Sequence, residues 1–179
     1  MMKKLLILGI VIVTLVAVYF TLYFIDVFGQ ILEVSGFNVF VESIEEQGYT
    51  EEYLIQRGIS PEQARDIVNH PNRYRSVDFT FRPHNHSVWA AIADIQIKAH
   101  LPEEAKKRIV WIDYNNVPPV REAEDEQLYF IVTIFKLEEG DTEVDLMEIC
   151  KQIRFTLTGK KVGFFDHGSI SVPVHFSGD

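Results

Sequence analysis

Two histidines separated by one residue, His84 and His86, are the side chains best spaced for metal chemistry. On a β-strand, side chains two positions apart share one face, so two imidazoles at this spacing can bind one metal ion such as zinc. We take His84, His86 and His167 as the candidate metal ligands. Further ligands would come from Asp78, His100, Asp166 or His175. The simpler interpretation of the pair is a solvated polar loop that holds no cofactor.

Nucleophilic catalysis has little support in the sequence. Asp166, His167 and Ser169 are the residue types of a catalytic triad, but they are near neighbours in one turn-like run. A working triad instead converges from separate elements. The single cysteine, Cys150, lies close to Glu148 in a run of acidic and apolar residues, which does not stabilise a thiolate. We therefore expect a buried structural cysteine and a protein without catalytic activity.

Two short stretches are candidate contact sites for a partner. Arg73, Tyr74 and Arg75 form a compact basic spot in the sequence, which suits an anionic surface. Pro118 and Pro119 lie in a connection that could present an extended polyproline segment to a partner. Loops that join structural elements are the simpler explanation of both stretches.

The charge of the chain excludes one large class of partners. There are 17 Lys+Arg residues against 26 Asp+Glu, for a net charge of −9, whereas binding to nucleic acid requires a basic face. The acidic run at residues 141–145 resembles the start of a calcium-binding loop. It lacks the glycine at the sixth position and the glutamate at the twelfth, which Leu146 and Gln152 occupy. Solvated loops account for the acidic runs.

A long apolar run near the N-terminus predicts a membrane anchor. Residues 5–25 are 21 consecutive uncharged and mainly apolar positions. As a helix they span roughly 30 Å, the thickness of the hydrocarbon core of a bilayer. A cleaved signal peptide and a buried core helix are the alternatives, but the run is long and lacks a small-residue cleavage site. The residues expected to contact lipid include Leu5, Ile12, Leu15, Tyr19, Phe20, Tyr23 and Phe24.

The charges that flank this run predict its orientation. Lys3 and Lys4 precede it, Asp26 follows it, and the next basic residue is Arg57. The positive-inside rule then places the N-terminus in the cytoplasm and residues 27–179 outside it. That external part has 15 Lys+Arg against 25 Asp+Glu.

Residues 27–75 read as a juxtamembrane segment with two short helices. The stretch 37–41 has the composition of a strand, although a helical continuation of the anchor remains open. Thr50 is a helix N-cap residue, and Ser60 followed by Pro61 marks a second helix that ends at His70. Helices this short need tertiary packing. The residues expected to dock them on the following domain are Tyr53, Leu54, Ile59, Ile67 and Val68.

Residues 76–179 are predicted to form a β-rich domain. Apolar residues alternate with polar ones from Val77 onward, and residues 128–135 are apolar on both faces, as in a central strand. Pro173 indicates an edge strand, and the capping pattern after Thr142 favours a helix there. The number of short strands predicts a β-sandwich-like fold, with an α+β sheet domain as the alternative.

These observations divide the chain into residues 1–26, a cytoplasmic tip with a transmembrane helix; 27–75, the juxtamembrane segment; and 76–179, the extracytoplasmic domain. The leading hypothesis is a single-pass, signal-anchored protein of the cell membrane whose ectodomain binds another membrane or envelope protein as a sensor, assembly or accessory module. The alternative is a metal-binding protein or metal-dependent enzyme that uses His84 and His86 with Asp166, His167 or His175.

Overall fold

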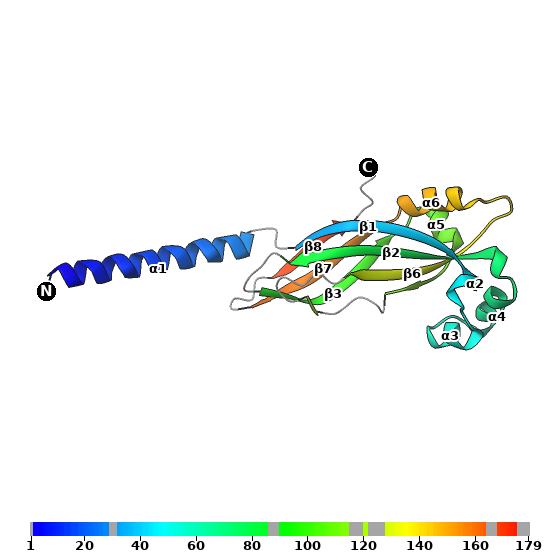
Figure 1. Cartoon of the computed structure of the whole chain (residues 1–179), viewed down its shortest axis with the longest axis horizontal. Coiled ribbons are helices and arrows are strands. Elements are labelled where there is room, and N and C mark those ends of the chain that lie inside the picture. The colour runs from blue at the N-terminus through cyan, green and yellow to red at the C-terminus, as the bar shows by residue number, and fades with distance from the viewer. Residues whose placement is uncertain are drawn as a thin grey trace.

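The computed structural model describes residues 2–28, 32–85, 90–114, 120–121, 128–163 and 168–174. The described chain is mainly β, with two four-stranded antiparallel sheets and a few helices (Figure 1). The first sheet has the order β1 (Leu32–Ser43), β2 (Tyr74–Asn85), β6 (Tyr129–Lys136) and β4 (Ile109–Asp113). The second sheet has the order β5 (Val120–Arg121), β3 (Ala90–His100), β7 (Arg154–Gly163) and β8 (Ser169–Val174). The expectation of a β-rich domain is confirmed.

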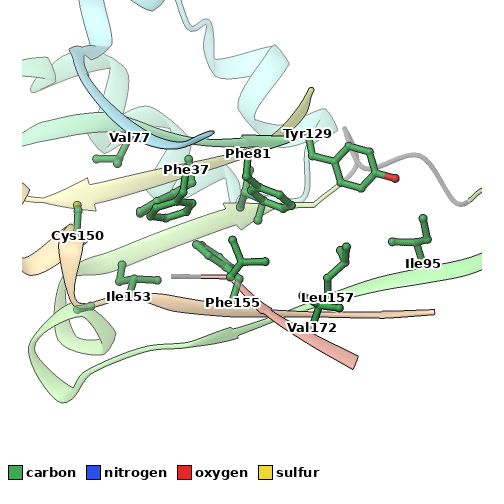
Figure 2. Close-up of a cluster of buried hydrophobic side chains, with 14 of the residues drawn as sticks. Phe37, Val77, Phe81, Ile95, Tyr129, Cys150, Ile153, Phe155, Leu157 and Val172 are labelled. Atoms are coloured by element: carbon green, nitrogen blue, oxygen red, sulfur yellow. The ribbon is translucent and has the colours of Figure 1, made fainter. Parts of the chain in front are cut away.

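One aromatic side chain of the second sheet lies among three of the first. The ring centroid of Phe155 on β7 lies 6.0 Å from that of Phe37, 5.2 Å from that of Phe79 and 6.4 Å from that of Phe81. Figure 2 shows Phe155 pointing from its strand toward the rings of Phe37 and Phe81. Leu157, Val172 and other inward-facing residues of both sheets belong to the same buried cluster. Burial of each such side chain contributes about 1.5–3 kcal/mol, so this core joins the two sheets.

Three short helices form a cap at one end of the first sheet. They are α2 (Ile44–Gln47), α3 (Glu51–Gln56) and α4 (Pro61–Asn69), followed by a 3₁₀ turn, η1 (Pro71–Arg73). The Thr50 side chain accepts a hydrogen bond from the backbone N–H of Tyr53, and the Ser60 side chain accepts one from Gln63. Both predicted N-caps are therefore confirmed. Leu54, Ile59 and Ile67 pack in a second buried cluster with Tyr74 and Ile134 of the sheet.

Two further helices lie at the end of the second sheet where β3 ends and β7 begins. α6 (Glu143–Lys151) begins at the predicted N-cap, where Thr142 and Asp145 exchange side-chain and backbone hydrogen bonds in a capping box. The other helix, α5 (Glu103–Arg108), was not expected from the sequence, because its apolar stripe is a single buried residue, Ala105. Arg108 fixes α5 instead: this residue is 8% exposed, and its guanidinium forms ion pairs with Glu104, Glu138 and Asp141.

The N-terminal helix α1 (Met2–Phe28) has 27 residues, about 40 Å of helix at 1.5 Å per residue. In Figure 1 it extends away from the two sheets. All of its described side chains are exposed. Over the part of the chain whose side chains the structure describes, however, no helix qualifies by length and hydropathy as a membrane span.

Sheet order tests several expectations from the sequence. β6, the strand with two apolar faces, lies between β2 and β4 and is therefore a central strand, as predicted. β8, which contains Pro173, is at the edge of its sheet, also as predicted. The stretch 37–41 lies within β1, which pairs with β2, so it is a strand and not a continuation of helix α1. The expected boundary between the juxtamembrane segment and the β-rich domain, at residue 76, therefore falls within β2 of the first sheet.

Candidate binding face on the first sheet

The outer face of the first sheet carries the residues that we assign to the candidate site. Alternation along β2 directs Val77, Phe79 and Phe81 into the core, so Asp78 and Thr80 project from the opposite face. The register places Asp78 between Phe40 on β1 and Val132 on β6. Two residues further along β2, Thr80 lies between Asn38 on β1 and Phe130 on β6. Three strands thus contribute to one surface.

The helical cap covers one end of this outer face. The Tyr49 hydroxyl lies 3.1 Å from the Ser76 hydroxyl, and the Trp111 indole N–H donates to the carbonyl oxygen of Arg57 at 3.1 Å. The Arg57 guanidinium forms an ion pair with Asp113 at 2.6 Å, and the Asp113 side chain is only 2% exposed. These contacts fix the cap over the part of the outer face that precedes Asp78 along β2, around Ser76.

Stacked aromatic rings stiffen the side of the cap next to the open part of the face. Tyr49 and Tyr53 are stacked with centroids 5.5 Å apart and an interplanar angle of 6°. Arg57 lies over the Tyr53 ring at 5.2 Å, a cation–π contact. Burial raises the pKa of the Tyr49 hydroxyl, with smaller contributions that include the nearby Asp78 carboxylate. The cap therefore presents a fixed, neutral hydroxyl near Asp78.

Beyond the cap, the face forms an open groove of about 450 Å³. A β-bulge between Ser35 and Asn38 shapes one wall, where Gly36 adopts a φ of +63°, a left-handed conformation that costs glycine little. We call this surface the open groove. Its lining residues are Ser35, Gly36, Asn38, Phe40, Glu42, Asp78, Thr80, Arg82, Leu128 and Phe130.

Asp78 is the unusual group in the open groove. Its Oδ1 atom is buried and has no hydrogen-bond partner among the described residues. Burial raises the pKa of the Asp78 carboxyl, and the nearby Glu42 carboxylate raises it further. An unpaired buried acceptor costs about 1–3 kcal/mol, so a ligand that donates a hydrogen bond to Oδ1 would recover that energy.

Large apolar side chains surround this carboxylate and are exposed to solvent. Phe40 is 51% exposed, Phe130 is 39% exposed and Leu128 is 36% exposed. One exposed apolar residue is ordinary, but three around one groove are typical of a contact surface for another molecule. The open groove can therefore offer apolar contacts and a hydrogen-bond acceptor to another molecule.

The metal hypothesis gains no support from the described residues. His84 lies on β2 opposite Glu33 and is partly buried. His86, Asp166, His167 and His175 lie outside the described residues, so their positions relative to His84 are not defined. Among the residues that are described, no group of three or more His, Cys, Asp or Glu side chains could hold a metal ion.

The predicted basic contact site lies where the cap meets the first sheet, because Arg73 ends η1 and Tyr74 and Arg75 begin β2. Tyr74 is 4% exposed and its hydroxyl donates to the Asp66 carboxylate, while His70 and Arg73 contact the same carboxylate at 2.8 and 3.8 Å. Burial, with the Asp66 hydrogen bond, raises the pKa of Tyr74 to about 12. The Arg75 guanidinium donates to the backbone oxygen of Tyr74. Tyr74 is therefore inaccessible to a partner, and Pro118 and Pro119 lie outside the described residues.

The remaining sequence-predicted residues have simpler outcomes. Cys150 is fully buried, as expected, and burial raises its thiol pKa to about 12, which keeps it unreactive. Ile12, Leu15, Tyr19 and Phe20 are exposed on α1. For Leu5, Tyr23 and Phe24, which also lie in α1, the side chains are outside the described set.

No protein-family model matches this chain, and no curated protein sequence matches it. The assignment of the site therefore depends on its geometry and chemistry alone.

Sequence reasoning missed the open groove, although a signal was present. Phe40 and Phe130 are large apolar residues on the faces of their strands that point away from the core, and Asp78 lies between Val77 and Phe79. Strand alternation alone identifies these as outward positions. Only the sheet order brings β1, β2 and β6 together so that the three side chains share a surface.

Proposed function

We propose that this protein is a membrane-anchored, extracytoplasmic binding or accessory protein without catalytic activity, and that it binds its partner in the open groove. The observation that carries the proposal is a buried carboxylate oxygen, Asp78 Oδ1, without a described hydrogen-bond partner at the centre of a groove with exposed apolar side chains. This combination suits recognition, because a partner supplies both a hydrogen-bond donor and an apolar surface.

Features of α1 support its role as the anchor. Its described large apolar side chains are 46–68% exposed, which a bilayer would cover. The hydroxyls of Thr14 and Thr21 each donate to the carbonyl four residues earlier, at 2.9 Å, so these polar groups need no water. Lys3 and Lys4 then favour a cytoplasmic N-terminus. In this arrangement residues 27–179 form the ectodomain.

We infer that the ectodomain body is a β-sandwich-like pair of sheets. The contacts of Phe155 with three rings of the first sheet support face-to-face packing. Such a body is rigid, which suits a binding module because its contact residues are fixed before the partner arrives.

The partner that fits the open groove is an extended protein segment with a cationic or other hydrogen-bond-donating side chain next to an apolar one. The donor would bind Asp78 Oδ1, and Glu42 in the same groove favours a positive charge on it. The apolar side chain would pack between Phe40, which lies opposite Asp78, and Phe130, which lies opposite Thr80. The acidic excess of the ectodomain also favours association with a basic partner.

The test is affinity capture of the full-length protein from its own membranes in mild detergent. We expect a co-purifying membrane or envelope protein that is lost when Phe40 and Phe130 are both replaced by Ser. The matched control replaces Val144 and Val162 by Ser, since these side chains are 71% and 50% exposed and do not line the groove.

Two results would contradict the proposal. One is equal capture by the groove variant and the control variant when both unfold at the wild-type temperature. The other is recovery of the chain in the soluble fraction after cell lysis, which would remove the anchor from the proposal.

A further inference from the structure

A cavity of about 700 Å³ lies at the distal end of the second sheet, apart from the open groove. Its described lining is Ala99, His100, Leu101, Pro102, Lys106, Lys151, Gln152 and Arg154. We call it the basic cleft, because three lining residues are Lys or Arg and a fourth is His. None of these lining residues is acidic, although the whole chain has a net charge of −9.

The cations reach the basic cleft from different elements. His100 ends β3 and lies directly opposite Arg154, the first residue of β7. The His100 ring is held in place by a 2.8 Å hydrogen bond shared between its Nε2 and the hydroxyl of Thr156. Lys106 comes from α5 and Lys151 ends α6. Tertiary structure therefore brings together charges that are up to about fifty positions apart in the chain.

A buried arginine holds the walls of the basic cleft. The Arg108 guanidinium on α5 donates to Asp141, which lies just before α6, and also forms an ion pair with Glu138. Asp141 in turn accepts a hydrogen bond from the backbone N–H of Glu138 at 2.7 Å. This network joins the helix that carries Lys106 to the turn that leads into the helix that carries Lys151. The cations are thus positioned before any ligand binds.

The ion pairs that the two lysines of the basic cleft form on their own helices are solvent-exposed. Lys106 and Lys151 each form an ion pair three residues back on their own helix, with Glu103 at 2.5 Å and Glu148 at 2.7 Å. Exposed pairs of this type contribute about 0–1 kcal/mol, so an anion with several charges can compete with them. Arg154 is exposed and forms no ion pair with any described residue.

We propose that the basic cleft binds a small polyanion that carries two or more phosphoryl groups. The volume is in the range of small-molecule sites and exceeds what one phosphate group fills. The planar guanidinium of Arg154 suits two oxygens of one phosphoryl group, and Lys106 and Lys151 supply point charges for a second. This site is independent of the open groove, which faces outward from the other sheet.

The basic cleft lies far from α1. β3 begins near the end of the first sheet that α1 adjoins, and its 11 residues carry the chain to His100, roughly 35 Å away. If α1 is the anchor, as proposed above, lipid headgroups of its own membrane are several Debye lengths from the cleft. The ligand is therefore soluble.

The experiment is isothermal titration of the full-length protein, in detergent, with tripolyphosphate and, separately, with citrate. We expect saturable binding of tripolyphosphate with one site per chain, and much weaker binding of citrate. Replacing Lys106, Lys151 and Arg154 together by Ala should weaken tripolyphosphate binding at least about tenfold, because charge-assisted hydrogen bonds are lost. Arg154→Lys should give a smaller loss, since the charge remains but the planar fork does not.

The matched control replaces Lys107, Lys136 and Arg65 by Ala, which removes the same charges from exposed positions that do not line the cleft. We expect the control to bind tripolyphosphate like the wild type at physiological salt. Equal weakening in both triple variants would overturn the proposal, because it would show an effect of net charge alone. No saturable binding by the wild type would also overturn it, as would citrate binding as tight as tripolyphosphate binding.

Discussion

The outer face of the first sheet differs in kind from the outer face of the second. On the first, the exposed residues around Asp78 include Phe40 and Phe130, and the helical cap covers the rest with a buried apolar cluster. On the second, the outward positions of β3 and β7 are polar or basic, among them Lys98, His100 and Arg154. Both sheets share one core, so the difference lies entirely in their outward-facing residues.

This difference shows how one β-rich body can carry two kinds of surface. An apolar outer face needs a cover, and the cap supplies it only over one end of the first sheet. The uncovered remainder is the candidate site for a partner. A polar outer face is stable in water without a cover, so it can carry charged side chains that contact a ligand, as we propose for the basic cleft.

The largest expected loss of stability follows from removing an apolar side chain that holds the cap. Leu54 is fully buried in the cap cluster, and Leu54→Ala should lower the free energy of unfolding by about 2–5 kcal/mol. Urea unfolding followed by circular dichroism measures it. The control, Val144→Ala at a side chain that is 71% exposed, should change stability by less than about 0.5 kcal/mol. Similar stabilities of the two variants would show that the cap does not depend on this cluster.

Loss of the ion pair beneath the cap should have the next largest effect. Asp113→Ala leaves Arg57 without its 2.6 Å partner, but Arg57 is 31% exposed and can regain water. We therefore expect a loss of about 1–3 kcal/mol, below the usual range for fully buried pairs. A double-mutant cycle with Arg57→Ala isolates the coupling between the two side chains. A coupling energy indistinguishable from zero would mean that the pair does not hold the cap.

A substitution in the open groove is expected to change the free energy of unfolding by less, and to raise it instead of lowering it. Because the pKa of Asp78 is raised in the folded state, its ionised form opposes folding, and Asp78→Asn should stabilise the protein by up to about 1 kcal/mol at neutral pH. The gain should shrink as the pH falls through the raised pKa and vanish below the ordinary value of 3.8, where both states are protonated. Thermal unfolding of both proteins across this pH range measures it. A gain that is constant with pH would show that ionisation is not its cause.

The smallest change in stability is expected from breaking an exposed ion pair on the second sheet. Lys160 and Asp94 form a 3.0 Å ion pair, and both side chains are more than 60% exposed. Asp94→Asn should change stability by less than about 0.5 kcal/mol, because exposed pairs contribute little and Asn tolerates the positive φ of 52° at this residue. Asp94→Ala should cost more, since Ala does not favour that conformation. Equal losses in chemical denaturation would indicate that the ion pair, not the backbone, is the stabilising feature.

Much of the local structure could be predicted from single residues. Thr50, Ser60 and Thr142 were recognised as N-caps because capping needs only a side chain and the next three backbone N–H groups. The central position of β6 was recognised from its two apolar faces. α5 was missed because two of the three acidic partners of its buried Arg108, Glu138 and Asp141, are about thirty residues away.

The candidate sites were less predictable than the elements that carry them. The expected contact at Arg73–Arg75 was chosen by charge density, but Tyr74 is buried because Asp66 and the cap cluster surround it. The open groove and the basic cleft each combine residues that no local pattern connects. Phe40, Asp78 and Phe130 meet through strand register, and Lys106, Lys151 and Arg154 meet through the packing of two helices against a sheet end.

The sequence by itself determined where α3, α4 and α6 begin, which strand is central and which is at an edge, and that the N-terminal run is apolar. Those properties follow from side-chain periodicity and capping, which act over a few residues. Only the tertiary structure decided that the cap covers one end of the first sheet and leaves Asp78 in an open groove. The physical reason is that burial depends on which distant side chains meet, and strand order and register set those meetings.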